Sequence, residues 1–264
     1  MFNRTAFIIF CLLFIVSSQL HARVDMIPHK LVIENRERSG EVIILNLSDE
    51  IHDYDLDAIH YRQNEDGAYE ILEAPLSPLF DPRDVIRMSP QRFQLSGKGR
   101  QKVRLSLRKP SDLPEGEYRF HLRAKADKRE QDKQANENVG ISMNIKFGIA
   151  IPIIIRHGDL SATGTIGNFE LVGPSRSASG KPELKFTASR QGNASTLGRV
   201  DVAWAADGQN FEDIGFITNF NIFTEIDKRF GAVPLDKLPS GGTVRVLYTD
   251  TITDEVYDEV IFNL

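Results

Sequence analysis

The segment VGISMNIKFGIAIPIIIR, residues 139–156, decides the fold of this chain. From residue 141 to residue 151 the odd positions carry large apolar side chains, whereas the even positions are small or polar. The apolar set is Ile141, Met143, Ile145, Phe147, Ile149 and Ile151. Strict alternation is typical of a β-strand with one apolar face, because successive side chains point to opposite sides. These residues would extend roughly 35 Å, about twice the length of a typical strand.

A charged stretch, KADKREQDKQANEN at residues 125–138, precedes this strand and contains no large apolar residue. Such a composition cannot bury enough apolar surface to fold, so it predicts a mobile loop. The long strand behind it has two interpretations. It packs its apolar face into the chain's own core, or it lends that face to a partner chain by β-augmentation. The pattern alone leaves both open.

The first residues have the pattern of a secretory signal peptide. Arg4 is followed by the apolar run AFIIFCLLFIV and the polar exit SSQLHA, which ends at Ala22. The run is too short to span a bilayer comfortably, so we expect residues 1–22 to be cleaved after export. Cys11 is the only cysteine, and the exported protein would therefore depend on its core without disulfides.

The rest of the chain predicts an all-β fold. Helical periodicity is scarce, and short alternating runs separated by turn residues recur, as in β-sandwiches. The clearest runs are residues 102–108 and 117–123. The polar stretch RHGD at residues 156–159 marks a boundary, which gives an N-terminal domain at 23–156 and a C-terminal domain at 157–264. The net charge of −5 is spread over mixed acidic and basic residues and does not indicate nucleic acid or a membrane surface as a partner.

No pattern of a catalytic, metal or cofactor site is present in the sequence. The histidines lack paired metal-ligand spacing, and we interpret His60 and His121 as structural residues of strands. Asp53, Asp55 and Asp57 alternate along one strand face, without the glycine and glutamate that close a calcium loop. Neither a GxSxG motif nor a phosphate-binding loop occurs. The sequence therefore favours a binding protein over an enzyme.

The segment MSPQRFQLSGKGRQKVRLSL, residues 88–107, is followed by LPEGEYRFHL at residues 113–122. Together they resemble the periplasmic pilus-assembly chaperones of the chaperone–usher pathway, in one of the less typical subgroups. The order of features carries the resemblance: a Ser-Pro turn, a Gln-x-x-Arg strand, a Glu-containing strand, a variable loop and a long alternating strand that ends in arginine. Here they are Ser89-Pro90, Gln101 and Arg104, Glu117, the loop to Asn138, the strand from Ile141 and Arg156. SRQGNASTLGRVDV at residues 189–202 is in keeping with the family's second domain.

The resemblance implies a boomerang of two immunoglobulin-like sandwiches and a non-enzymatic function in the periplasm. The chaperone lends its long strand to incomplete pilus subunits and delivers them to an outer-membrane usher. The donor residues would be Ile141, Met143, Ile145, Phe147, Ile149 and Ile151. Whether the free protein caps itself as a homodimer stays open.

The family anchors the subunit's C-terminal carboxylate with two basic residues. Their positions fall on Lys30, which keeps the charge, and on Pro152, which does not. Lys146 and Arg156 are the candidates for a rebuilt anchor. For Arg156 an ion pair between the domains, with Glu117, is the interpretation that we favour.

A secreted two-domain adhesin or carbohydrate-binding module is the competing hypothesis. Such modules usually display exposed aromatic residues in a shallow groove. The single tryptophan, Trp204, lies in an apolar strand and is predicted to belong to the core.

Overall fold

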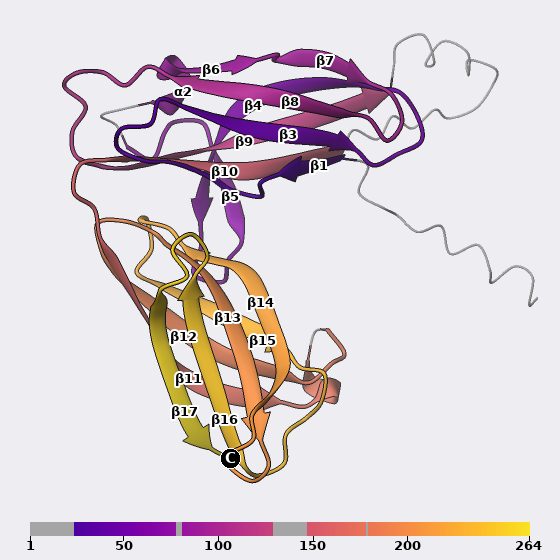
Figure 1. Ribbon diagram of the computed structural model, residues 1–264, viewed down its shortest axis with the longest axis vertical. Helices are drawn as coiled ribbons and strands as arrows, with labels where there is room; N and C mark the ends of the chain where they lie inside the picture. Colours follow the sequence, from indigo (N-terminus) through magenta and orange to yellow (C-terminus); the bar gives the residue numbers. More distant parts are fainter. Residues whose placement is uncertain (1–23, 78–80, 129–146, 178) are drawn as a thin grey trace, which may run out of the picture.

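The computed structural model describes residues 24–77, 81–128, 147–177 and 179–264. These residues form two β-sandwiches that meet at an angle (Figure 1), and the predicted all-β fold of two immunoglobulin-like sandwiches is confirmed. The expected signal peptide and residues 129–138 of the expected loop lie outside the described residues, as do Ile141, Met143, Ile145 and Lys146. Residues 125–128, which we expected in the loop, continue a strand.

The first sandwich consists of two sheets. One has the strand order β1 (Val24–Ile27), β3 (Ser39–Asn46), β8 (Arg100–Leu107) and β6 (Ile86–Ser89). The other has the order β2 (Leu31–Ile33), β10 (Phe147–His157), β9 (Gly116–Lys128), β4 (His52–Gln63) and β5 (Tyr69–Leu72), with β7 (Arg92–Leu95) also paired to β4. A short helix, α2 (Pro82–Val85), precedes β6.

The core of the first sandwich follows from strand alternation. In β8, Val103, Leu105 and Leu107 are buried while the residues between them are exposed or half-buried. The nearly continuous apolar run EVIILNL at residues 41–47 predicts a central strand, and β3 does lie between β1 and β8. Burying each such aliphatic side chain contributes about 1.5–3 kcal/mol.

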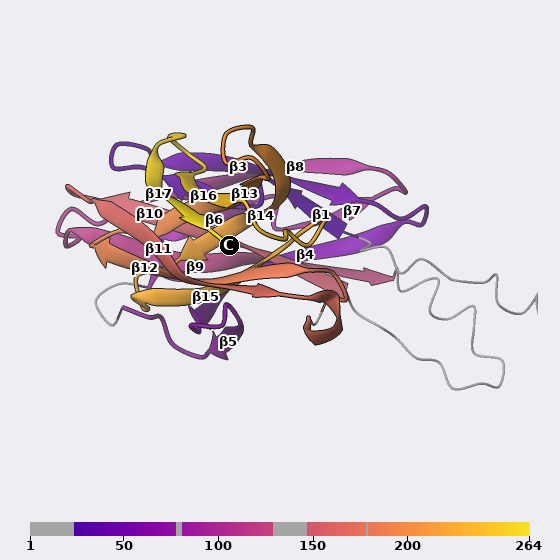
Figure 2. The same ribbon diagram turned by 90° about the horizontal axis from the view of Figure 1, so that it is seen from below.

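The second sandwich packs a three-stranded sheet against a four-stranded one (Figures 1 and 2). The first has the order β11 (Ala162–Val172), β12 (Glu183–Gly192) and β15 (Lys228–Pro234), with the 3-10 helix η1 (Pro174–Arg176) after β11. The second has the order β14 (Glu212–Ile222), β13 (Thr196–Ala205), β16 (Thr243–Asp250) and β17 (Val256–Asn263). The sequence predicts separate strands at 160–166 and 169–172, but β11 is continuous because a bulge between Gly167 and Glu170 absorbs the interruption.

A hydrogen-bonded joint connects the two sandwiches. The β4–β5 hairpin extends from the first sandwich toward the second (Figure 1). At the end of β4 the wholly buried Gln63 uses both ends of its amide: Nε2 donates to the carbonyl of Asn221 at 3.1 Å, and Oε1 accepts from the backbone N–H of Phe223 at 3.1 Å. One side chain of the first sandwich thus satisfies two backbone groups of the second.

Ionic and apolar contacts complete this joint. Arg119 Nη2 donates to Glu225 Oε1 at 2.5 Å, and its guanidinium carbon lies 3.7 Å from the centre of the Phe223 ring. Phe223 also packs with Ile154 of β10 and Leu197 of β13, all of them fully buried. The joint therefore combines directional hydrogen bonds with apolar packing.

We expect Gln63→Ala to destabilise the protein by about 1–3 kcal/mol, because it leaves the N–H of Phe223 buried without a partner, whereas the carbonyl of Asn221 keeps its hydrogen bond from Arg229. Urea denaturation measures the change. The neighbouring Arg62→Ala is the matched control, since Arg62 is exposed and should change stability by no more than about 0.5 kcal/mol. Equal stability of the two variants would contradict the assignment of the joint.

Candidate functional site

The two edges of β10 have different surroundings. One edge pairs with β9 along the whole strand, from Phe147 opposite Ala126 to His157 opposite Gly116. The other edge pairs in parallel with β2, and only from Ile153 to Ile155. At residues 147–152 no strand of the described chain pairs with this second edge. An unpaired strand edge presents free N–H and C=O groups to which another chain can add a strand. This edge is the candidate site.

Both faces of β10 are used within the chain. Ile151, Ile153 and Ile155 are buried in the core of the first sandwich, and Ile149 is half-buried against it. On the opposite face, Ile154 packs in the joint and Pro152 is buried. Of the six predicted donor residues, the structure thus places Ile151 in the chain's own core, leaves Ile149 partly exposed and puts Phe147 at the first position of the strand.

Lys30 lies where the open edge meets β2. The parallel register sets Leu31 opposite Ile153, so Lys30 and Pro152 are the next residues along. These are the two positions that the family resemblance assigns to the carboxylate anchor. The half-buried Lys30 Nζ donates to Thr251 Oγ1, in the turn between β16 and β17. Burial lowers the pKa of Lys30, an effect that the carboxylate of Asp250 partly opposes. A single ammonium therefore marks the end of the open edge, beside the second sandwich.

Arg156, the other predicted anchor, is bonded within the chain. Its Nε lies 3.1 Å from Glu117 Oε2, its Nη1 lies 3.3 Å from Glu34 Oε1, and its Nη2 donates to the carbonyl of Ser195 at 3.2 Å. Glu117 also accepts hydrogen bonds from the backbone N–H and the hydroxyl of Ser195. Burial lowers the pKa of Arg156, but the charges of Glu117 and Glu34 outweigh it and raise the pKa overall. The ion pair with Glu117 is present, but it lies within one sheet of the first sandwich and not between the domains as predicted; the hydrogen bonds of Arg156 and Glu117 to Ser195 make the connection to the second sandwich.

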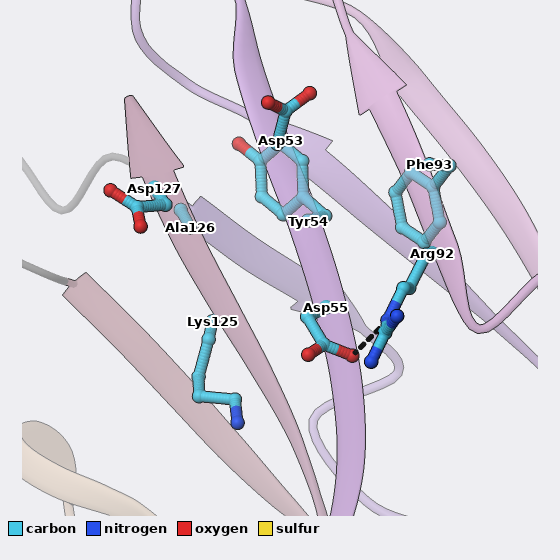
Figure 3. Close-up of a pocket in the computed structure, with 8 residues that line it drawn as sticks. All are labelled: Asp53, Tyr54, Asp55, Arg92, Phe93, Lys125, Ala126 and Asp127. Atoms are coloured by element: carbon cyan, nitrogen blue, oxygen red, sulfur yellow. Dashed lines mark ion pairs between the residues drawn. The ribbon is translucent and has the colours of Figure 1, made fainter. Parts of the chain in front are cut away.

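The alternating aspartates lie on a face of paired charges. Asp53, Asp55 and Arg92 line a hollow of about 520 Å³ over β4, β7 and β9 (Figure 3). Arg92 lies 3.5 Å from Asp55, and Gln94 donates to Asp53 at 3.0 Å. Asp57 accepts from Arg123 and Lys125; burial raises the pKa of Asp57, but these two cations outweigh it and hold the pKa below its usual value. Among the described residues no group of acidic, histidine or cysteine side chains could hold a metal ion.

The two strand histidines lie in buried structural positions. His60 Nε2 is 3.2 Å from Asp81 Oδ1. His121 packs edge-on against Tyr61 and Tyr69, with ring centres 4.8 and 5.4 Å away, and its Nδ1 has no hydrogen-bond partner among the described residues. Burial, with smaller effects of the nearby charges of Arg119 and His60, lowers the pKa of His121 to about 3. The imidazole of His121 is therefore neutral at pH 7.

Sequence reasoning missed the residues of the joint, Gln63, Phe223 and Glu225. Gln63 ends an alternating strand as one more polar residue, and Glu225 follows a strand end, so neither interrupts a pattern. By alternation Gln63 falls in the outward register of β4, with Asp53, Asp55 and Asp57, so no local signal marks it as buried.

Comparisons with known proteins find similar solved structures but no similar sequence. No protein-family model matches the chain, and no curated protein sequence is similar to it. Among solved structures, the chain is similar to the class 5 fimbriae chaperone CfaA, with 15% identity, a TM-score of 0.45, and coverage of 91% of this chain and 98% of that one. The E. coli chaperone DraB shares 14% identity at a TM-score of 0.42, covering 91% and 95% of the two chains. A structure of the Salmonella enterica SafA pilin in complex with the SafB chaperone shares 13% identity at a TM-score of 0.42, covering 91% and 96%.

CfaA is a chaperone of class 5 fimbriae, and SafB was solved in complex with a pilin. Within the described part of the chain, no helix has the length and apolar character needed to cross a membrane.

We expect His121 to make stability depend on pH. Because its folded pKa of about 3 lies below the usual 6.5, the unfolded chain binds a proton between these values that the folded chain does not. The free energy of unfolding should therefore fall as the pH drops below about 6.5, by roughly 2–3 kcal/mol at pH 4.5. Urea denaturation of His121→Phe should show a flatter pH dependence than the wild type. His29→Phe, at an exposed position, is the control and should keep the wild-type slope; equal slopes for all three proteins would show that His121 is not the responsible group.

Proposed function

We propose that this protein is a periplasmic chaperone that binds and caps pilus subunits by donor-strand complementation and delivers them to an outer-membrane usher. Residues 1–22 direct its export, and the domains 23–156 and 157–264 form the two arms. The proposal is carried by one observation, the open edge of β10 at residues 147–152 with Lys30 at its end. Binding by strand addition requires no catalytic group, cofactor or metal.

In this mechanism a strand of the subunit pairs with the open edge of β10. The ladder of backbone hydrogen bonds is independent of sequence, so the side chains and the register select the subunit. Ile141, Met143, Ile145 and Phe147 supply the apolar row that fills the subunit's groove. Burying each contributes about 1.5–3 kcal/mol before ordering costs. A shift by one residue would present Ser142, Asn144 and Lys146 instead, a face with little to bury.

Because Ile151 is buried, the C-terminal end of β10 packs in the first sandwich and is not available to the subunit. Ile151, Ile153 and Ile155 fix β10 in the first sandwich, so the strand is held by the core at one end. Ile149 is half-buried and lies between the apolar residues that we assign to the subunit's groove and those that pack in the chain's own core. The strand is thus anchored by the chain that lends it.

Lys30 would bind the carboxylate at the C-terminus of the subunit. In the free chain its ammonium donates to a neutral hydroxyl, that of Thr251. A carboxylate is the stronger partner, because its negative charge adds a Coulomb attraction to the ammonium that a neutral hydroxyl does not supply. When the subunit's carboxylate takes the place of the Thr251 hydroxyl as the partner of Lys30, it would fix the register of the added strand.

In the absence of a subunit, two copies could cover each other's open edges, which is the self-capping homodimer. The alternative function, a carbohydrate-binding module, draws no support from Trp204. Its indole Nε1 donates to the carbonyl of Gly241 at 2.8 Å, and the ring packs on the second core with Lys237 4.4 Å from its centre.

Ile145→Asp combined with Phe147→Asp should abolish subunit capture without unfolding the chaperone. The melting temperature should stay within a few degrees of the wild type, while a co-expressed subunit loses its solubility. Ser142→Asp combined with Asn144→Asp adds the same charge to the opposite face and should retain capture.

Ile151→Asp is the contrasting variant, because a charge in the first core should unfold the protein by itself. If the Ile145 and Phe147 variant unfolds in the same way without any subunit, the strand serves only the chain's own core and the chaperone mechanism is wrong.

Lys30→Ala should weaken subunit binding by about 3–5 kcal/mol, the cost of leaving the partner's carboxylate buried and unpaired. Lys30→Arg keeps the charge and should retain most of the affinity. Calorimetric titration with a purified subunit measures both. Unchanged affinity of Lys30→Ala would remove Lys30 from the site and leave Lys146 as the candidate anchor.

A further inference from the structure

The outer face of the first four-stranded sheet carries a concentration of positive charge. Because side chains alternate along a strand, the burial of Val103, Leu105 and Leu107 sends Arg100, Lys102 and Arg104 of β8 to the opposite side. Arg87 of the neighbouring β6 lies opposite Ser106 and is also exposed. We call the set Arg87, Arg100, Lys102 and Arg104 the cationic face. In Figure 1, β6 and β8 lie at the margin of the first sandwich away from the second.

Most of these charges are not neutralised within the described chain. Lys102 lies 3.0 Å from Glu41 of β3. Arg87, Arg100 and Arg104 form no ion pair with any residue that the structure describes. Alternate residues of a strand are about 7 Å apart, so the cations form a dense array. Exposed arginines of like charge at this spacing repel one another, which favours binding of an anionic surface.

An apolar strip borders the cationic face. Ile27 of β1 lies opposite Ile43 of β3, and Leu45 is two residues further along the same outward side. Ile27 is 45% exposed, and Ile43 and Leu45 are half-buried. Asp25, the acidic residue next to Leu45, lies 3.7 Å from His29. On this sheet face β1 and β3 therefore present the apolar strip together with two carboxylates, Asp25 and Glu41, the latter opposite Arg104, and β8 and β6 present the cationic face.

We propose that this face binds an anionic phospholipid surface peripherally, with phosphate groups on the arginines and the apolar strip at the headgroup level. The planar guanidinium group binds phosphate oxygens in pairs, which makes arginine the preferred residue for phosphate recognition. Cationic and apolar side chains side by side are the composition of interfacial binding, in which electrostatic attraction to anionic lipids adds to apolar burial. An acidic protein would use the cations but has less need of the apolar strip.

The sheet that carries this face is not the sheet of β10, so a membrane-bound molecule keeps its open edge free. The proposal rests on the export that we propose for residues 1–22, which would bring the protein next to membranes. It does not depend on subunit capture, and either function can fail without the other.

The test is co-sedimentation of the signal-free protein, residues 23–264, with vesicles of phosphatidylglycerol and phosphatidylcholine in equal parts, at 0.15 M salt, against vesicles of phosphatidylcholine alone. The wild type should sediment with the anionic vesicles only. Arg87→Gln, Arg100→Gln and Arg104→Gln combined should lower partitioning roughly 100-fold, because each basic residue near an anionic bilayer contributes about fivefold.

The matched control is Arg176→Gln, Lys181→Gln and Lys185→Gln combined, which removes the same charge from exposed positions of the second sandwich. All six positions are exposed, so both variants should keep the wild-type circular dichroism and melting temperature.

Three results would overturn the proposal. If the wild type does not bind the anionic vesicles, the face is not a lipid site. If both triple variants lose binding equally, net charge and not this face is responsible. If vesicles are not bound while the face variant alone loses retention on immobilised polyglutamate, the face recognises carboxylates and its partner is an acidic protein.

Discussion

The structure depends on β10, because this strand is bound on nearly every side. Its one edge is paired with β9 along the full length, and its odd-numbered side chains from Ile151 onward fill the first core. Its opposite face supplies Ile154 to the joint with the second sandwich, and its end supplies Arg156 to Glu117 and Ser195. What remains unused in the described chain is the second edge before Ile153. A displacement of β10 would disturb the core, the joint and this edge together.

Polar contacts define how the two sandwiches meet. Apolar burial is non-directional, so the packing of Ile154, Leu197 and Phe223 favours contact without fixing an angle. Hydrogen bonds have preferred directions, and the amide of Gln63 and the carboxylate of Glu117 each bond two groups of the second sandwich. A buried ion pair such as Arg119 with Glu225 contributes little net stability, because desolvation offsets most of the attraction. We infer that the pair contributes to the specificity of an arrangement in which Lys30 lies beside the turn at Thr251.

Local periodicity predicts the strands but not the contacts between distant strands. The alternation in β3, β8 and β9 predicts those strands, and the family resemblance predicts that residues 30 and 152 lie together, as the register of β2 and β10 places them. The strands β1, β7 and β15 are missed, the first two because each has only four residues and the third because it contains Gly231 and Pro234. The contact between Gln63 and Phe223 joins residues 160 positions apart, and no local pattern encodes it. The charge distribution is missed for a different reason: basic residues that alternate with apolar ones along a strand read as mixed in sequence, yet they gather on one face once the strand forms.

Alternation also cannot distinguish a face that serves the chain's own core from one that serves a partner, since both require the same apolar row. The structure separates the two by the neighbours of β10. The row is buried in the first sandwich from Ile151 onward, and β2 covers the second edge from Ile153 to Ile155. Before that point Ile149 is only half-buried and the edge is open. Pro152 stands at the change, and proline is tolerated in a strand only where its missing N–H is not needed, as at a sheet edge. A strand already ordered by β9 and by its own core does not have to be ordered again on binding, where fixing each backbone residue would cost about 1–2 kcal/mol. The same packing that makes Ile151 unavailable to a partner therefore makes the open edge beside it a better template for one.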